Sequence, residues 1–91
     1  MNKTDMGVTL NELADGAVSE DYSVEVYIGS VKTWQVKVIT PSGREVDVET
    51  KRGTVKTWTV FENALRDVQL YARGVKSISV KCRGMTFVLQ K

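Results

Sequence analysis

Basic side chains are the residues of this sequence with the clearest potential for chemistry, and most of them lie in its second half. Residues 1–50 hold four basic and nine acidic side chains, a net charge of −5, whereas residues 51–91 hold nine basic and two acidic side chains, a net charge of +7. Such an asymmetry indicates a polyanionic partner. The side chains that we expect to contact nucleic acid are Lys51, Arg52, Lys56, Arg66, Arg73, Lys76, Lys81 and Arg83.

These side chains could act in two ways. If they form one positive rim, they can contact backbone phosphates without reading the base sequence. The alternative is an ordinary solvated surface, which is where most charged residues lie. The leading hypothesis is therefore a non-catalytic nucleic-acid-binding protein, either of DNA or of RNA.

Catalytic chemistry has little support in the sequence. The chain contains no histidine, the commonest general base near neutral pH and the commonest metal ligand. Glu45, Asp47 and Glu49 line one predicted strand, but no Gly-rich loop or further oxygen ligands accompany them, as a Ca²⁺ site would require. Isolated turn glycines form no phosphate-binding loop. We expect no enzyme, no catalytic residue, no metal and no cofactor.

Leu70 supports a second hypothesis, in which the chain binds another protein and not nucleic acid. Helical spacing places it on the face of Arg66 and Arg73, away from the core stripe. An exposed leucine between two arginines could anchor a protein interface, including that of a homodimer, in an interaction or inhibitor module. Otherwise, the N-terminal turn that carries Leu10 and Leu13 could fold over it.

Alternation of apolar and polar residues predicts the strands that must position these groups. The inward sets are Tyr22, Val24, Val26 and Ile28; Trp34, Val36 and Val38; Val46 and Val48; and Trp58. Two Gly-ended loops fit this register, with Thr40 opposite Arg44 and Thr50 opposite Thr54, which places Val46 opposite Trp58. The loop between Ile28 and Trp34 needs Val31 as a third residue after Gly29 and Ser30, or a bulge, to bring Ile28 and Trp34 to the same face. We expect a four-stranded antiparallel meander over residues 22–58.

The remaining segments complete an α+β fold in a single domain of residues 1–91. We expect flexible residues at 1–8, a short helix over 9–17 with a Thr9/Glu12 capping box, and an amphipathic helix over 59–73 that Thr59 caps. The core stripe of that helix is Phe61, Ala64, Leu65, Val68 and Ala72, and Gly74 ends it. A terminal hairpin over 76–90 turns at Arg83-Gly84, with Cys82 in the core. The helices pack on the sheet.

A repeated octapeptide is the most conspicuous motif. Gly29–Val36 and Gly53–Val60 agree at six of eight positions. Two tryptophans beside lysines could stack nucleic-acid bases on a sheet. The alternation of side chains along each strand instead predicts that Trp34 and Trp58 are core residues. We expect their two strands to flank the segment 44–50 and to run in the same direction.

The cellular setting is inferred from what the sequence lacks. No apolar run is long enough to cross a bilayer, the N-terminal residues lead into no signal-peptide core, and the one cysteine forms no internal disulfide. We expect a cytoplasmic protein without a membrane partner.

Residues 52–80 carry a resemblance. Arg52-Gly-Thr-Val-Lys-Thr-Trp-Thr-Val-Phe-Glu-Asn-Ala-Leu, followed by Ala-Arg-Gly-Val-Lys-Ser-Ile-Ser-Val, is similar to a module of small accessory proteins of plasmids, phages and integrative elements. The resemblance covers about a third of the chain and brings no defined catalytic residues. It implies a mobile-element accessory protein, a group in which many members handle DNA or interfere with host factors.

Overall fold

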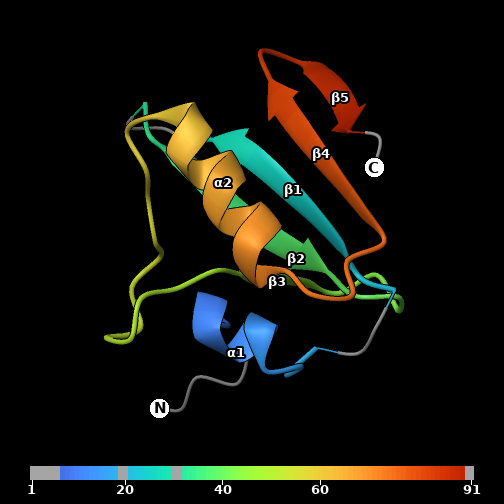
Figure 1. Cartoon of the computed structure of the whole chain (residues 1–91). Helices are drawn as coiled ribbons and strands as arrows, with labels where there is room; N and C mark the ends of the chain where they lie inside the picture. Colours follow the sequence, from blue (N-terminus) through green and yellow to red (C-terminus); the bar gives the residue numbers. More distant parts are fainter. Residues whose placement is uncertain (1–6, 19–20, 30–31, 90–91) are drawn as a thin grey trace.

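The computed structural model describes residues 7–18, 21–29 and 32–89, which form a mixed five-stranded sheet with two helices (Figure 1). The elements are α1 (Leu10–Ala14), β1 (Ser23–Ile28), β2 (Trp34–Ile39), β3 (Glu45–Asp47), α2 (Phe61–Tyr71), β4 (Ser77–Cys82) and β5 (Met85–Leu89). The strand order is β3-β2-β1-β4-β5, and α2 packs on β1 and β2. The predicted α+β class is confirmed.

The sheet is mixed because α2 carries the chain back to the end of the sheet where β1 begins. β1 and β4 are parallel, with Val24 beside Ile78 and Val26 beside Val80. The Lys76 amide donates to the Tyr22 carbonyl oxygen at 2.7 Å, which fixes the start of β4 next to the start of β1. The expectation of a wholly antiparallel sheet is therefore wrong at this pairing.

The first three strands follow the predicted register. Val24 and Val26 of β1 lie opposite Val38 and Val36 of β2, and Val38 lies opposite Val46 of β3. The Thr40 amide donates to the Arg44 carbonyl oxygen at 2.9 Å, as the three-residue loop requires. Ile28 and Trp34 lie opposite each other and so share a face, although Val31 lies outside the described residues.

A fourth meander strand does not form. The Thr50 amide does donate to the Thr54 carbonyl oxygen, but pairing with the segment 44–50 stops at the bridge between Glu49 and Val55. Trp58 then bridges Trp34 of β2 instead of lying opposite Val46. Residues 49–57 are thus a hairpin that leaves the edge of the sheet at Val48 and returns to it at Trp58. We call this segment the 49–57 hairpin.

The two copies of the octapeptide pair with each other. The Trp34 and Trp58 amides each donate to the carbonyl oxygen of the other residue, at 2.7 and 2.9 Å, in an antiparallel bridge. The expectation that the copies flank the segment 44–50 in the same direction is wrong. Their assignment to the core is confirmed for Trp58, which is 8% exposed, and Trp34 is partly buried beside Phe61, with ring centroids 4.8 Å apart.

Helix α2 buries Ala64 and Val68, and its C-cap Ala72 is also buried. The helix ends before Gly74, whose φ is 79°. Its N-cap is Val60, which forms no side-chain cap hydrogen bond, so the predicted Thr59 cap is wrong. The reason lies in Trp58, whose backbone is held by Trp34 and whose indole Nε1 donates to Asp67 Oδ2 at 2.9 Å. These contacts fix the chain up to Trp58 and delay the first helical turn.

The predictions for the two ends of the described chain are confirmed except at Val8 and Cys82. Thr9 and Glu12 form the predicted capping box of α1, and Leu13 is buried. Val8, expected to be flexible, is buried and bridges Val48, which ties α1 to the start of the 49–57 hairpin. Residues 1–6 lie outside the described residues. The C-terminal hairpin forms as predicted, with Cys82 opposite Met85, although Cys82 is only partly buried.

Candidate functional site

The 49–57 hairpin presents Lys51 and Lys56 on one side of the molecule. Its turn closes through the Thr50 and Thr54 hydroxyls, 2.9 Å apart, and through Gly53, whose φ of 89° suits a residue without a side chain. The Lys56 amide donates to the Val48 carbonyl oxygen at 2.9 Å, which anchors the returning arm to the sheet. Local sequence therefore sets the spacing of the two lysines.

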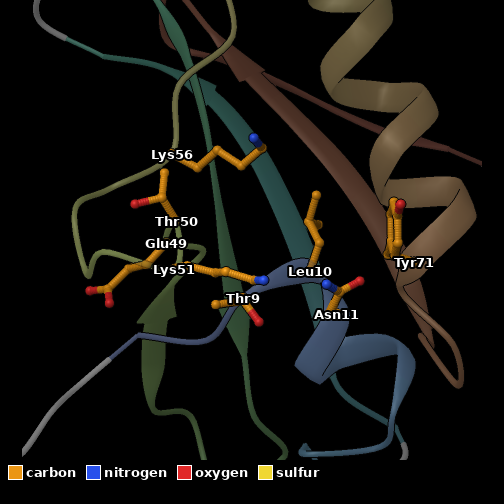
Figure 2. A pocket seen from close by; sticks show the side chains of 8 residues that line it. All are labelled: Thr9, Leu10, Asn11, Glu49, Thr50, Lys51, Lys56 and Tyr71. Carbon is orange, nitrogen blue, oxygen red and sulfur yellow. The ribbon is translucent and has the colours of Figure 1, made fainter.

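Helices α1 and α2 supply the other walls of a hollow at this hairpin. Val8 brings the start of α1 beside Glu49, whose amide donates to the Val8 carbonyl oxygen at 2.8 Å. The hollow has a volume of about 230 Å³. We call it the lysine hollow, and its lining residues are Thr9, Leu10, Asn11, Glu49, Thr50, Lys51, Lys56 and Tyr71 (Figure 2).

The ammonium groups of Lys51 and Lys56 are available to a ligand. Within the described residues, the ion pairs involve Lys37 and Arg66, and neither hollow lysine has a carboxylate within 4.0 Å. Figure 2 shows the Glu49 carboxylate pointing to the other side from the two ammonium groups. Lys56 Nζ lies 5.3 Å from the centroid of the Trp58 ring, an attraction that restrains its stem.

The size and lining of the hollow define what it can bind. Pockets for drug-sized ligands usually exceed about 300 Å³, so this volume suits a smaller group such as a phosphate. Lysine ammonium groups bind phosphate as point charges, and the nearby hydroxyls of Thr9 and Tyr71 can add hydrogen bonds. The arrangement can hold an anion without performing covalent chemistry.

The eight predicted basic residues come from three parts of the fold. Arg52 lies in the turn of the 49–57 hairpin beside Lys51. Lys81 lies on β4, three strands from β3 and so about 14 Å away at the usual spacing, and Arg83 lies in the turn after it. The remaining three are exposed on or just after α2: Arg66, Arg73 and Lys76.

Leu70 is exposed to solvent, as its helical position predicts. It is 65% exposed, so the alternative in which the N-terminal turn covers it is wrong. Leu10 and Leu13 instead pack toward the core, and Leu10 also lines the hollow. Sequence reasoning named Lys51 and Lys56 but missed Tyr71 and Asn11, because contact between α1, α2 and the hairpin has no local signal.

Comparison of the chain with models of protein families, with curated proteins and with solved structures yields no match. The assignment of a function therefore depends on the geometry of the chain itself. In the part of the chain that the structure describes, no helix is both long and apolar enough to cross a membrane.

The face of the sheet opposite α2 is polar and carries its own network. Lys37 Nζ lies 3.1 Å from Glu45 and 3.7 Å from Glu25, and it lies 5.4 Å from the centroid of the Tyr27 ring. The hydrogen bond to Glu45 raises the pKa of Lys37. Because two carboxylates lie close to Lys37, this network is less suited to phosphate than the lysine hollow.

Alkaline pH should destabilise the fold. Burial raises the pKa of Tyr22 and Tyr27 above the ordinary value of 10.0, and the pKa of Lys37 is raised above 10.5. In all three cases the folded chain keeps its proton at a pH where the unfolded chain has lost it, so stability is complete below about pH 10 and falls as pH rises further. The Tyr22 hydroxyl also donates to the Arg73 carbonyl oxygen at 2.7 Å, a bond that ionisation removes.

Urea unfolding at a series of pH values between about 8 and 11 measures this loss. We expect the midpoint to be constant at the lower end and to decline above pH 10. Tyr22→Phe should weaken the decline because it removes one of the titrating groups. A midpoint that stays constant to pH 11 would contradict the assignment.

Proposed function

We propose that this chain is a non-catalytic nucleic-acid-binding protein that holds backbone phosphate at the lysine hollow. The observation that carries the proposal is the approach of Lys51 and Lys56 to one phosphate-sized hollow, without a carboxylate partner among the described residues. Arg52, exposed in the adjacent turn, would contact a neighbouring phosphate. Three contacts of this kind position a protein on nucleic acid without reading the base sequence.

The low net charge of the chain requires that any binding of nucleic acid be local. Formal net charge is only +2, which gives little general attraction for a polyanion. Binding therefore depends on where positive groups gather. The 49–57 hairpin projects from the edge of the sheet, so Lys51 and Arg52 in its turn are exposed to a polyanion (Figure 1).

Affinity for nucleic acid should fall steeply with salt. Each phosphate contact releases counterions, so three contacts on duplex DNA predict about a 40-fold loss of affinity between roughly 50 and 200 mM salt. Fluorescence anisotropy with labelled duplex and single-stranded oligonucleotides of several sequences measures it. We expect similar affinities for different sequences, and a smaller salt slope for single strands. Absence of binding at low salt, or an affinity that salt leaves unchanged, would contradict the proposal.

A role as an accessory protein of a plasmid, phage or integrative element extends this proposal. Its support is the resemblance of residues 52–80, which include Arg52 and Lys56 of the 49–57 hairpin. The genes that neighbour the gene for this chain are the most direct observation on that role.

A further inference from the structure

Strand β5 is an edge strand that exposes several large apolar side chains. Met85, Phe87 and Val88 are 55%, 53% and 61% exposed. Helix α2 packs on β1 and β2 and leaves the β4–β5 side of the sheet open (Figure 1). Residues 85–89 include no charged side chain and no proline, the devices that usually protect an edge from pairing with another chain. An edge of this kind is suited to strand addition.

The hairpin geometry determines which backbone groups of β5 face outward. Arg83 and Gly84 both have positive φ, 53° and 80°, and form a two-residue turn closed by Cys82 and Met85. Alternation along an antiparallel ladder then directs the N–H and C=O groups of Met85, Phe87 and Leu89 toward β4. The groups of Thr86 and Val88 point outward, and none of the described residues outside β5 provides a backbone partner for them.

We propose that β5 pairs antiparallel with β5 of a second copy of this chain, around a twofold axis at Phe87. In this register Thr86 lies opposite Val88 of the second copy, and each such pair exchanges two backbone hydrogen bonds. The four outward groups of each strand are thereby satisfied. Phe87 lies opposite its own counterpart in a non-hydrogen-bonded pair, where the Cα atoms approach to about 4.5 Å. The two sheets become one sheet of twice the width.

The side chains of β5 are complementary to themselves in this arrangement. On the face of α2, Met85 meets Leu89 and Phe87 meets Phe87. On the other face, Thr86 meets Val88, so no charged residue of the strand is buried. This self-matching is the property that an isologous interface requires, and it selects a second copy rather than an unrelated strand.

The area of this interface indicates a weak dimer. The three exposed apolar side chains each present on the order of 100 Å² to water, so two copies remove at most about 600 Å² of apolar surface. The paired backbone edges add to this area. The total stays near or below the lower end of about 1,200–2,000 Å² that stable complexes bury. Association should therefore depend on protein concentration in the micromolar range or above.

Sedimentation equilibrium of the full chain over a wide concentration range tests the proposal. We expect the mean mass to rise from monomer to dimer with concentration. Val88→Pro should remain monomeric, because it removes an outward N–H that β4 does not use. Leu70→Ser, a change of an equally exposed apolar residue on α2, should dimerise like the wild type.

A charge exchange at the axis keeps the test valid even if Val88→Pro disturbs the fold. Phe87→Lys and Phe87→Glu should each be monomeric, because like charges meet at the axis, and an equimolar mixture of the two should regain association. A wild-type chain that is monomeric at every concentration would overturn the proposal. So would a dimer that Leu70→Ser dissociates and Phe87→Lys leaves intact, since the interface would then lie on α2.

Discussion

Replacement of Trp58 by alanine should lower the free energy of unfolding by about 3–5 kcal/mol, the range for a buried tryptophan. Trp58 is 8% exposed, and its indole Nε1 donates to Asp67 at 2.9 Å. A single domain is stable by only about 5–15 kcal/mol, so this loss removes a large share of its stability. The variant also leaves the Asp67 carboxylate without its indole partner.

Urea unfolding followed by circular dichroism measures the change, because a fluorescence signal would be altered by the substitution itself. Trp58→Phe keeps most of the ring and should cost less, about 1–3 kcal/mol for the lost hydrogen bond and the reduced volume. Thr57→Ala, at the exposed neighbouring position, should have little effect. If Trp58→Ala kept full stability but lost affinity for nucleic acid, the tryptophan would be a ligand-contacting residue and the assignment to the core would fail.

Reversal of charge at the lysine hollow should abolish most nucleic-acid binding. In the double variant Lys51→Glu/Lys56→Glu, two phosphate contacts are replaced by two repulsive ones, and we expect about a 100-fold loss of affinity near 0.1 M salt. Lys51 is exposed and Lys56 is partly exposed, so the fold should survive the change. Anisotropy with a labelled duplex measures the loss, and circular dichroism checks the fold.

The matched control is Lys81→Glu/Arg83→Glu. It changes the net charge by the same amount, but near the β4–β5 edge of the sheet, opposite the β3 edge that carries the 49–57 hairpin. A general attraction between the chain and a polyanion would make the two double variants equally weak. We expect the control to lose only a few-fold in affinity, the part that long-range attraction contributes. Equal losses would refute a localised site.

Local patterns predict much of this fold. The turns at Thr40–Arg44 and Thr50–Thr54, the register of Val38 with Val46 and the terminal hairpin all depend on residues close together in the chain. Turn chemistry and strand parity are sufficient for such features. The same reasoning fails where distant segments compete for one position.

The expected fourth strand is the clearest failure. Parity and the Gly53 turn predict that the chain after Thr54 continues along the segment 44–50. In the structure Trp58 instead occupies the place beside Trp34, where its ring is covered and its indole reaches Asp67 of α2. Burial of a large aromatic side chain stabilises the fold more than a few further strand pairs would. The place where Trp58 is buried depends on the position of α2, which local sequence does not predict.

The candidate site was half predictable for the same reason. Lys51, Arg52 and Lys56 are close in sequence, so a basic cluster around one turn can be read directly. The residues that turn this cluster into a hollow come from α1 and from the end of α2, at Thr9 and Tyr71. Their approach depends on the bridge between Val8 and Val48, a pairing of residues 40 positions apart for which the sequence holds no local signal.

The salt dependence of binding in a charge-neutral variant tests the central claim most directly. Each lost phosphate contact lowers the slope of log affinity against log salt by about 0.9 on duplex DNA. For Lys51→Gln/Lys56→Gln we predict a slope shallower than that of the wild type by about two, and for Lys81→Gln/Arg83→Gln a slope close to that of the wild type. A hollow variant with the wild-type slope would contradict the account, because the two lysines would then contact no phosphate.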